Sequence, residues 1–488
     1  MKQLELPVAR IEAELIRQSL LAMGRTAPNP PVACVLAVRY QDDSGWHLFG
    51  GATEPPGQKH AEVVCLDRYA AHQAGRSVDE AHLYVTLEPC SREGRTPPCV
   101  DRILQYPEIQ SIYIYSADPT IQAEGLQRLR TAHRPVIMMP EDSELQPADL
   151  YLRGWLGRVQ SGTPRLHAKL AMTADGWIGT LNRRVLISGS AASGFGQVMR
   201  RLCDAVLVGP GTLWTDLPGL DLRPADATGL RQFWQQRHMH TADPLRVGNQ
   251  EWATGLPGEN TTPIANRPQS RGDALVSGRL FRHLELIMES AEQDLRAYQP
   301  RRILMPGRFT EQRFRQLSNV INRQNELELS TGQAAVFFLT GPDAIHWRRH
   351  LPEDRCRQLP AFDDRDFVRE LQQGLSDLGL NEVLVEGGAS LLERLIGVVQ
   401  NLYVLRSNQT GRERGIQESD RPVAAPGWIR RLVQSTDTTL TGELPREVRS
   451  TVQTYAGQND EFLELSNHAV YDLGPDKLEV VGIRHKIT

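Results

Sequence analysis

The chain has 488 residues, of which 40% are hydrophobic and 23% charged, a composition typical of a globular protein with two or three domains. Its net charge of −4 gives no electrostatic basis for binding nucleic acid or an anionic membrane, so we expect neither partner. No apolar run approaches the roughly 20 residues that span a bilayer. Six cysteines are too few for a disulfide scaffold in so long a chain and favour a reducing, cytoplasmic location.

The first 148 residues predict alternating helices and strands, which is typical of an α/β layer structure. Apolar residues at helical spacing predict helices over residues 8–23 and 60–73, and a further helix opens at Val100 and runs to Leu104. Strands are expected over residues 32–38, 82–87, 111–115 and 135–139. We assign residues 1–148 to one domain.

Within this domain, one imidazole and two thiols form a metal-ligand pattern. His60 precedes Glu62 by two residues, and Cys90 follows a strand and a Glu-Pro step, with Cys99 further along the loop. Each residue alone is more often structural than metal-bound. Together, His60, Cys90 and Cys99 can hold tetrahedral Zn²⁺ with one open position for an activated water. Glu62 is then the catalytic proton shuttle, as zinc deaminases of nucleobases require.

Residues 140–165 predict the connection between the domains, because Pro140, Pro147 and Pro164 lie among polar residues there, and we assign residues 149–164 as the linker. The second domain, residues 165–488, opens with a strand over 165–172. Ser188 and Gly189 precede a helix that runs to about Leu202. Further strands are expected at 205–208, 335–339 and 383–385, and a helix over 367–378.

The second domain also holds a long insertion, at about residues 224–333. It is rich in Gly, Pro, Asn and Thr, with a helical patch around 280–295 and a strand-like run at 303–305. Long irregular segments are usually lids, inserted subdomains or disordered loops. We expect a lid or an oligomerisation element here.

Two strands of the second domain end in glycine-rich turns. One turn begins at Gly209 and the other comprises Glu386, Gly387 and Gly388. Glycine lets the backbone approach a pyrophosphate, and a following helix N-terminus favours anions. The turns therefore favour a dinucleotide site, although glycines after strands are more often simple turns and no G-x-G-x-x-G fingerprint is present.

The motifs of the first half resemble the deaminase half of the bifunctional riboflavin-biosynthesis deaminase/reductases. The runs that carry this resemblance are Ala27–Pro30, Leu87–Ser91, Gly94–Cys99 and Ser116–Pro119. Three later runs resemble the reductase half of the same enzymes, in the same order: residues 168–176, 204–212 and 385–388. The resemblance covers most of residues 8–223 and 334–400.

This resemblance implies a cytidine-deaminase-like α/β/α sandwich, with zinc at two helix N-termini, followed by a dihydrofolate-reductase-like α/β domain that uses NADPH. It implies hydrolytic deamination of 2,5-diamino-6-(5-phosphoribosylamino)pyrimidin-4(3H)-one and reduction of the product's ribosyl side chain to the ribityl form. The partner is then a small pyrimidine nucleotide. Since relatives commonly assemble, we expect a homo-oligomer.

By motif position, the resemblance also implies binding residues. The residues implied to contact substrate are Asn29, Arg95, Lys169, Arg200, Leu220, Arg223 and Glu386. The residues implied to contact the cofactor are Ala171, Ser188, Gly209, Thr212, Asp216, Gly387 and Gly388. Because Arg200 and Arg201 are adjacent on a helix, we expect one of them to face only solvent.

Several residues depart from the family pattern. Thr53 and Arg92 stand where histidines are usual near the deaminase substrate, and Trp177, Leu186 and Leu217 alter the reductase motifs. Two alternatives therefore stay open: a diverged paralogue acting on another pyrimidine or purine-derived nucleotide, and a deaminase with a non-catalytic reductase-like half. The sequence also does not decide whether the cofactor is NADPH or NADH.

Overall fold

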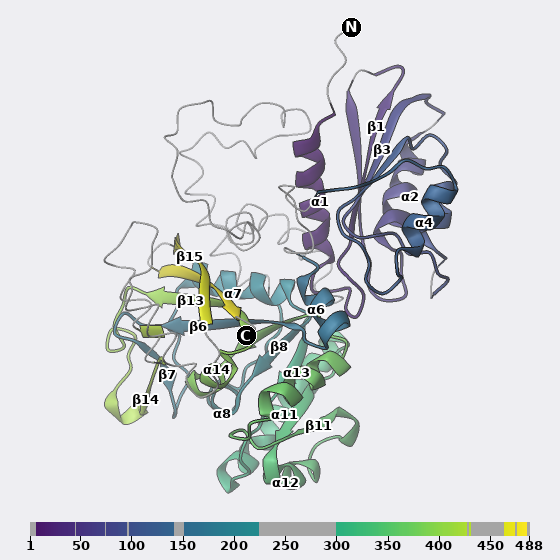
Figure 1. Ribbon diagram of the computed structural model, residues 1–488. Coiled ribbons are helices and arrows are strands. Elements are labelled where there is room, and N and C mark those ends of the chain that lie inside the picture. Colours follow the sequence, from purple (N-terminus) through teal and green to yellow (C-terminus); the bar gives the residue numbers. More distant parts are fainter. Residues whose placement is uncertain are drawn as a thin grey trace. The chain divides into compact units, whose positions relative to one another are not determined.

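The computed structural model describes residues 6–43, 45–73, 75–94, 97–140, 151–223, 299–426, 429–430, 463–473 and 476–485. Described residues up to Ser161 belong to one compact unit, and those from Gly162 onward belong to a second. Figure 1 draws the first unit in purple and blue and the second in teal, green and yellow. No helix within these ranges has the length and hydropathy of a transmembrane span.

A five-stranded mixed sheet forms the centre of the first unit, in the order β2-β1-β3-β4-β5. β1 runs antiparallel to both neighbours, whereas β3, β4 and β5 are parallel. The strands are β1 (Ala33–Tyr40), β2 (Trp46–Ala52), β3 (Val78–Val85), β4 (Ser111–Ile114) and β5 (Val136–Met138). The helices are α1 (Val8–Ala22), α2 (Ala61–Gln73), α3 (Cys99–Leu104), α4 (Glu124–Thr131) and α6 (Arg153–Ser161). Every residue of β1 is buried, because α1 lies on one side of the sheet and α2 and α4 on the other (Figure 1).

The expected α/β alternation of this half is confirmed, since each predicted helix and strand overlaps an observed one. Two elements were not predicted, β2 and α4. The predicted linker, residues 149–164, contains α6. Leu152 and Trp155 from this segment are buried in the core of the first unit, and residues 141–150 lie outside the described ranges.

The second unit is built on a nine-stranded sheet in the order β11-β10-β9-β8-β12-β6-β13-β16-β15. Strands from β11 to β13 are parallel, and β16 and β15 continue the sheet antiparallel. The strands of the large sheet are β6 (Arg165–Met172), β8 (Ala205–Val208), β9 (Arg301–Leu304), β10 (Val336–Thr340), β11 (Cys356–Leu359), β12 (Glu382–Glu386), β13 (Val399–Ser407), β15 (Leu463–Leu473) and β16 (Asp476–His485). A separate pair consists of β7 (Trp177–Thr180) and β14 (Pro422–Ala424).

The helices of this unit are α7 (Ser190–Leu202), α8 (Pro210–Asp216), α11 (Glu311–Thr331), α12 (Ala344–Arg348), α13 (Phe367–Asp377) and α14 (Ala389–Leu395), with short 3₁₀ turns at Gly341–Asp343, Glu353–Arg355 and Glu418–Asp420. β8 and most of β12 are buried, as expected for parallel strands covered on both faces. On α13, Phe367, Leu371 and Leu375 recur every four residues and enter the core. The predicted α/β class is therefore confirmed for both halves.

The end of the predicted insertion belongs to this sheet. The strand expected at 303–305 is observed as β9, which pairs with β8 and β10. α11 follows it and also falls within residues 224–333. Residues 224–298, including the helical patch expected at 280–295, lie outside the described ranges.

Candidate functional site

The three predicted metal ligands come together in the first unit. His60 immediately precedes α2, Cys90 lies in the loop after β3, and Cys99 is the first residue of α3. His60 Nδ1 lies 3.3 Å from Cys99 Sγ and 3.6 Å from Cys90 Sγ. Bonds of about 2.1 Å to nitrogen and 2.3 Å to sulfur would place tetrahedral zinc ligands roughly 3.5–3.8 Å apart. The cluster therefore has dimensions that fit Zn²⁺.

The electrostatics of the cluster favour a thiolate. A hydrogen bond from Cys99, together with the neighbouring His60, lowers the pKa of Cys90 to about 4. The same contact and burial raise the pKa of Cys99. The bond to Cys90 also raises the pKa of His60. A preformed thiolate beside an imidazole is the ligand set that binds zinc readily.

Glu62 lies beside this cluster, one residue into α2, and is only 4% exposed. Burial raises the pKa of its carboxyl group, and its side chain hydrogen-bonds to Cys99. A buried carboxyl group with a raised pKa accepts and returns protons more readily near neutral pH than an exposed one. This arrangement suits a proton shuttle.

The loop that carries Cys90 is held by α4. The Glu88 carboxylate accepts hydrogen bonds from the backbone N–H of Leu126, at 3.0 Å, and of Asp118, at 3.3 Å. Gly125 lets the helix approach closely, because a Cβ at this position would lie 2.1 Å from the Pro89 carbonyl oxygen. Sequence reasoning missed this support because α4 follows the loop by about thirty residues, beyond the reach of local motifs.

In the first unit, the residues that depart from the family pattern, Thr53 and Arg92, contact other parts of the protein. Thr53 is buried, and its hydroxyl donates to the Val32 carbonyl at 3.4 Å. The Arg92 guanidinium forms an ion pair with Glu124, with Nε at 2.7 Å from Oε2. Asn29 lies half-buried in a turn, where its N–H donates to the Thr26 carbonyl. Arg95 lies outside the described residues.

In the second unit, the two glycine turns lie next to each other. β8 and β12 are adjacent parallel strands, so their carboxyl ends meet at one edge of the sheet. A Cβ on Gly387 would lie 3.8 Å from the backbone nitrogen of Gly209, and Leu391 packs against both glycines. Ligands of open α/β sheets bind at this edge. Thr212 on α8 and Gly388 before α14 lie on the same two turns.

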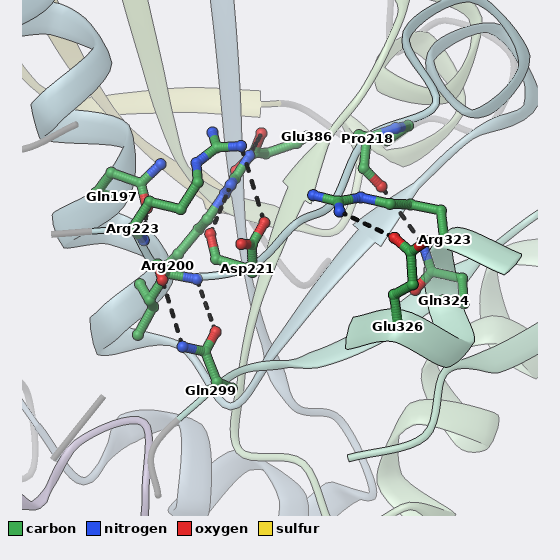
Figure 2. A network of polar contacts seen from close by, with 11 residues as sticks. Gln197, Arg200, Pro218, Asp221, Arg223, Gln299, Arg323, Gln324, Glu326 and Glu386 are labelled. Carbon is green, nitrogen blue, oxygen red and sulfur yellow. Dashed lines mark hydrogen bonds and ion pairs between the residues drawn. The ribbon is translucent and has the colours of Figure 1, made fainter. Parts of the chain in front are cut away.

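A charged cluster lies beside these turns. The Arg200 guanidinium forks onto Glu386, with Nε–Oε1 at 2.5 Å and Nη2–Oε2 at 2.8 Å, and the two side chains are 11% and 12% exposed. Figure 2 shows this pair with Arg223 and Asp221. Burial alone would raise the pKa of Glu386, but Arg200, Lys169 and Arg223 outweigh it and lower this pKa to about 2. The carboxylate is therefore ionised at neutral pH.

Lys169 and Asp216 complete the charged cluster. Burial lowers the pKa of Lys169, while Glu386 opposes this effect. Burial likewise raises the pKa of Asp216, which Lys169 and Arg184 partly offset. The site therefore combines two carboxyl groups and several cationic side chains in surroundings with little solvent. Such an arrangement is typical of functional sites.

The structure corrects one expectation about the paired arginines of α7. Arg201 is 3% exposed and Arg200 binds Glu386, so neither faces only solvent. The reason is that α7 packs against both β12 and β16, which leaves little of its surface free.

The remaining predicted positions are spread around the glycine turns. Ala171 is half-buried on β6, Ser188 is buried just before α7, and Leu220 is buried with φ of 60°. Among the departing residues, Leu186 is exposed and Trp177 packs against Gly411. Leu217 ends α8 with φ of 43°. Sequence reasoning missed Gln197, Asp221 and Gln299, which carry no motif.

Comparisons with known proteins agree with this geometry. Residues 10–116 match the cytidine and deoxycytidylate deaminase zinc-binding region. The riboflavin biosynthesis protein RibD of Mycobacterium tuberculosis is 35% identical over 217 residues, which cover 44% of this chain and 60% of that protein. The matched region thus spans about three fifths of the length of this curated relative.

Solved structures share the fold across both units. Acinetobacter baumannii RibD matches with a TM-score of 0.57 at 20% identity and covers 97% of this chain and 98% of its own. The diaminohydroxyphosphoribosylaminopyrimidine deaminase/5-amino-6-(5-phosphoribosylamino)uracil reductase of Thermotoga maritima matches with a TM-score of 0.55 at 19% identity, covering 97% of each chain. The predicted α/β class is confirmed, with a cytidine-deaminase zinc-binding region in the first half and a fold over both halves that is shared with solved RibD structures. The chain carries a deaminase zinc-binding region in a RibD-like fold, and it resembles the riboflavin biosynthesis proteins RibD.

Proposed function

We propose that this chain catalyses two consecutive steps of riboflavin biosynthesis. Its first unit deaminates 2,5-diamino-6-(5-phosphoribosylamino)pyrimidin-4(3H)-one, and its second unit reduces the ribosyl side chain of the product with NADPH. The observation that carries the proposal is the His60, Cys90 and Cys99 cluster with the buried Glu62 beside it. The name of the Thermotoga maritima neighbour supports the choice of substrate.

In the first unit, His60, Cys90 and Cys99 would hold Zn²⁺, and the metal would supply an activated water for hydrolysis at the amino-bearing ring carbon. Glu62 would accept one proton from that water and pass it to the ring nitrogen as hydroxide adds to the carbon. It would then accept the proton of the new hydroxyl group and pass it to the amine, so that ammonia leaves as the C–N bond breaks and C=O forms. Burial of Glu62 supports this role, because a raised carboxyl pKa lets one group act as base and then as acid. Asn29 and Arg95 hold the substrate.

In the second unit, NADPH supplies the hydride when bound. The turns at Gly209 and Gly387 let the backbone approach the cofactor. Lys169 and Arg223 give positive charge for the phosphate and polar groups of the substrate. Arg200 already forks onto Glu386, so its role is to hold that carboxylate in place.

A paired assay on zinc-loaded protein tests the proposal. The diaminopyrimidinone ribosylamine phosphate is supplied with NADPH, and ammonia release and NADPH oxidation are followed together. Glu62→Gln should abolish ammonia release and spare zinc binding, because the amide keeps the shape of the side chain but cannot shuttle protons. A matched control is Glu393→Gln on α14, which should release ammonia at the parent rate. Deamination retained by the Glu62→Gln variant would refute the assigned role.

The same assay separates the alternatives. Ammonia release without NADPH oxidation would indicate a deaminase with a silent reductase-like half. Neither signal, with one zinc ion bound per chain, would indicate a diverged paralogue acting on another nucleotide. Repeating the assay with NADH in place of NADPH shows which of the two cofactors the second unit uses.

A further inference from the structure

The loop from Leu217 to Arg223 has an unusual backbone. It follows α8 directly after Asp216 and carries Asp221 beside Arg200 of the charged cluster (Figure 2). Leu217 and Leu220 both have positive φ, at 43° and 60°. Left-handed conformations are unfavourable for residues with a Cβ, and surrounding structure must hold them. Something outside the loop must therefore fix its shape.

Three glutamine side chains bind the peptide groups of this loop (Figure 2). Gln299 pairs with both polar groups of Leu222: Oε1 accepts from the N–H at 2.7 Å, and Nε2 donates to the carbonyl at 3.4 Å. Gln197 Oε1 accepts from the N–H of Arg223 at 3.0 Å. Gln324 Nε2 reaches the Pro218 carbonyl at 3.5 Å, the longest of these contacts.

These glutamines are buried and come from separate elements. Gln197 lies on α7, Gln299 precedes β9 and Gln324 lies on α11, and their residues are only 5%, 6% and 5% exposed. Gln324 is itself held by Arg302 on β9, whose Nε donates to Oε1 at 2.8 Å. Buried hydrogen bonds of this kind are costly to leave unmade, so they constrain the loop strongly.

The loop is also joined to the charged cluster. Arg200, which forks onto Glu386, donates through Nη1 to the Asp221 carbonyl at 3.0 Å. Arg223 adds positive charge that helps lower the pKa of Glu386. The position of the loop therefore sets where Arg223 and Leu220 stand relative to Glu386.

We propose that Gln197 and Gln299 are positioning residues of the reductase site, which hold the loop Leu217–Arg223 in its left-handed shape so that Arg223 and Leu220 meet the phosphoribosyl part of the substrate. This rests on the proposed function. Gln324 and Arg302 support the first part of the loop. Since these contacts act remotely from the transferred hydride, they affect substrate binding more than the chemical step.

The test compares isosteric variants in the full chain. Gln197→Met and Gln299→Met keep the side-chain length but remove the acceptor, whereas Gln197→Glu keeps an acceptor for the Arg223 N–H. Gln373→Met is the matched control, because Gln373 is exposed on α13 and its side chain binds Asp377. Two quantities are measured: hydrogen exchange of residues 217–223, and KM and kcat for NADPH-dependent reduction of 5-amino-6-(5-phosphoribosylamino)uracil.

The two methionine variants should exchange faster across residues 217–223, and KM should rise roughly tenfold with kcat nearly constant. Gln197→Glu should restore most of the parent KM, and Gln373→Met should change neither quantity. Exchange unchanged in both methionine variants overturns the proposal. So does faster exchange with an unchanged KM, which would leave a structural role only.

Failure of the proposed function gives a different result. If the parent chain does not oxidise NADPH with this substrate, the reductase function and the role in substrate binding both fall. The exchange data then still decide whether the glutamines hold the loop.

Discussion

Replacing Arg200 by Met should destabilise the second unit in a pH-dependent way. In the parent, Arg200, Lys169 and Arg223 hold the pKa of Glu386 at about 2 despite burial, against an ordinary value of 4.5. A shift of this size corresponds to about 3 kcal/mol, and breaking a buried ion pair typically costs roughly 3–5 kcal/mol. Because Arg200 supplies the largest part of the lowering, we expect a loss of about 3 kcal/mol at pH 7.

The sign of the pH dependence follows from the direction of the shift. A lowered folded-state pKa contributes stability that is complete above about 4.5 and disappears as the pH falls toward about 2. In the variant, the carboxylate stays buried without its guanidinium, so its pKa rises and protonation relieves the penalty. The destabilisation should therefore be largest at neutral pH and smaller at pH 4.5.

The free energy of unfolding is measured in urea at both pH values. Arg200→Met, Glu386→Gln and the double variant form a double-mutant cycle with the parent. The control is Arg315→Met on α11, whose exposed partner is Glu311, and it should change stability very little. An equal loss at pH 7 and pH 4.5, or additive single variants, would refute the reasoning.

Three further predictions concern the predicted zinc site and Arg302, which supports the loop Leu217–Arg223 through Gln324. Gly125→Ala should lower zinc content and deamination together, because its Cβ would lie 2.1 Å from the Pro89 carbonyl oxygen, whereas Gly94→Ala meets nothing within 4 Å and should keep both, as measured by metal analysis and ammonia release. Arg302→Met should destabilise the second unit by about 3 kcal/mol, measured by urea unfolding, because it removes a fully buried guanidinium and leaves Gln324 Oε1 without the donor that Arg302 supplies; an effect as small as that of Arg315→Met would contradict this. A chelator should stop ammonia release and leave NADPH oxidation on the uracil intermediate unchanged, and added zinc should restore the first; loss of both activities would show that the two sites are not independent.

The cluster of His60, Cys90 and Cys99 was predictable because its sequence signal is local. His60 and Glu62 are two residues apart, and Cys90 and Cys99 belong to one loop with a recognisable Pro-Cys step. Residue type and spacing alone specify that chemistry. The charged cluster was only partly predictable. The resemblance implied Lys169, Arg200, Asp216, Arg223 and Glu386, but not Asp221, and not the ion pair of Arg200 with Glu386, which joins residues 186 apart in the sequence.

Elements without a clean periodic pattern were missed for physical reasons. β2 contains Gly50 and Gly51, which weaken a strand pattern. Yet Gly51 is needed there, because a Cβ would lie 2.1 Å from the Ala61 carbonyl oxygen of α2. α11 is mostly polar and buries only four residues, so its apolar face is too sparse to stand out. The contact of Gln299 with Leu222 joins residues 77 apart and has no sequence signal at all.

That contact has a consequence for how the chain tolerates change in length. The pairing of Leu222 with Gln299 joins two residues that lie 77 positions apart in the sequence, on either side of residues 224–298. The entropy lost on closing a flexible loop grows only with the logarithm of its length, by about 0.6 kcal/mol for each doubling. Once its two ends are joined, a connection of almost any length can be accommodated at this point. An insertion or deletion between these two residues should therefore leave the pairing of β8 with β9 in register.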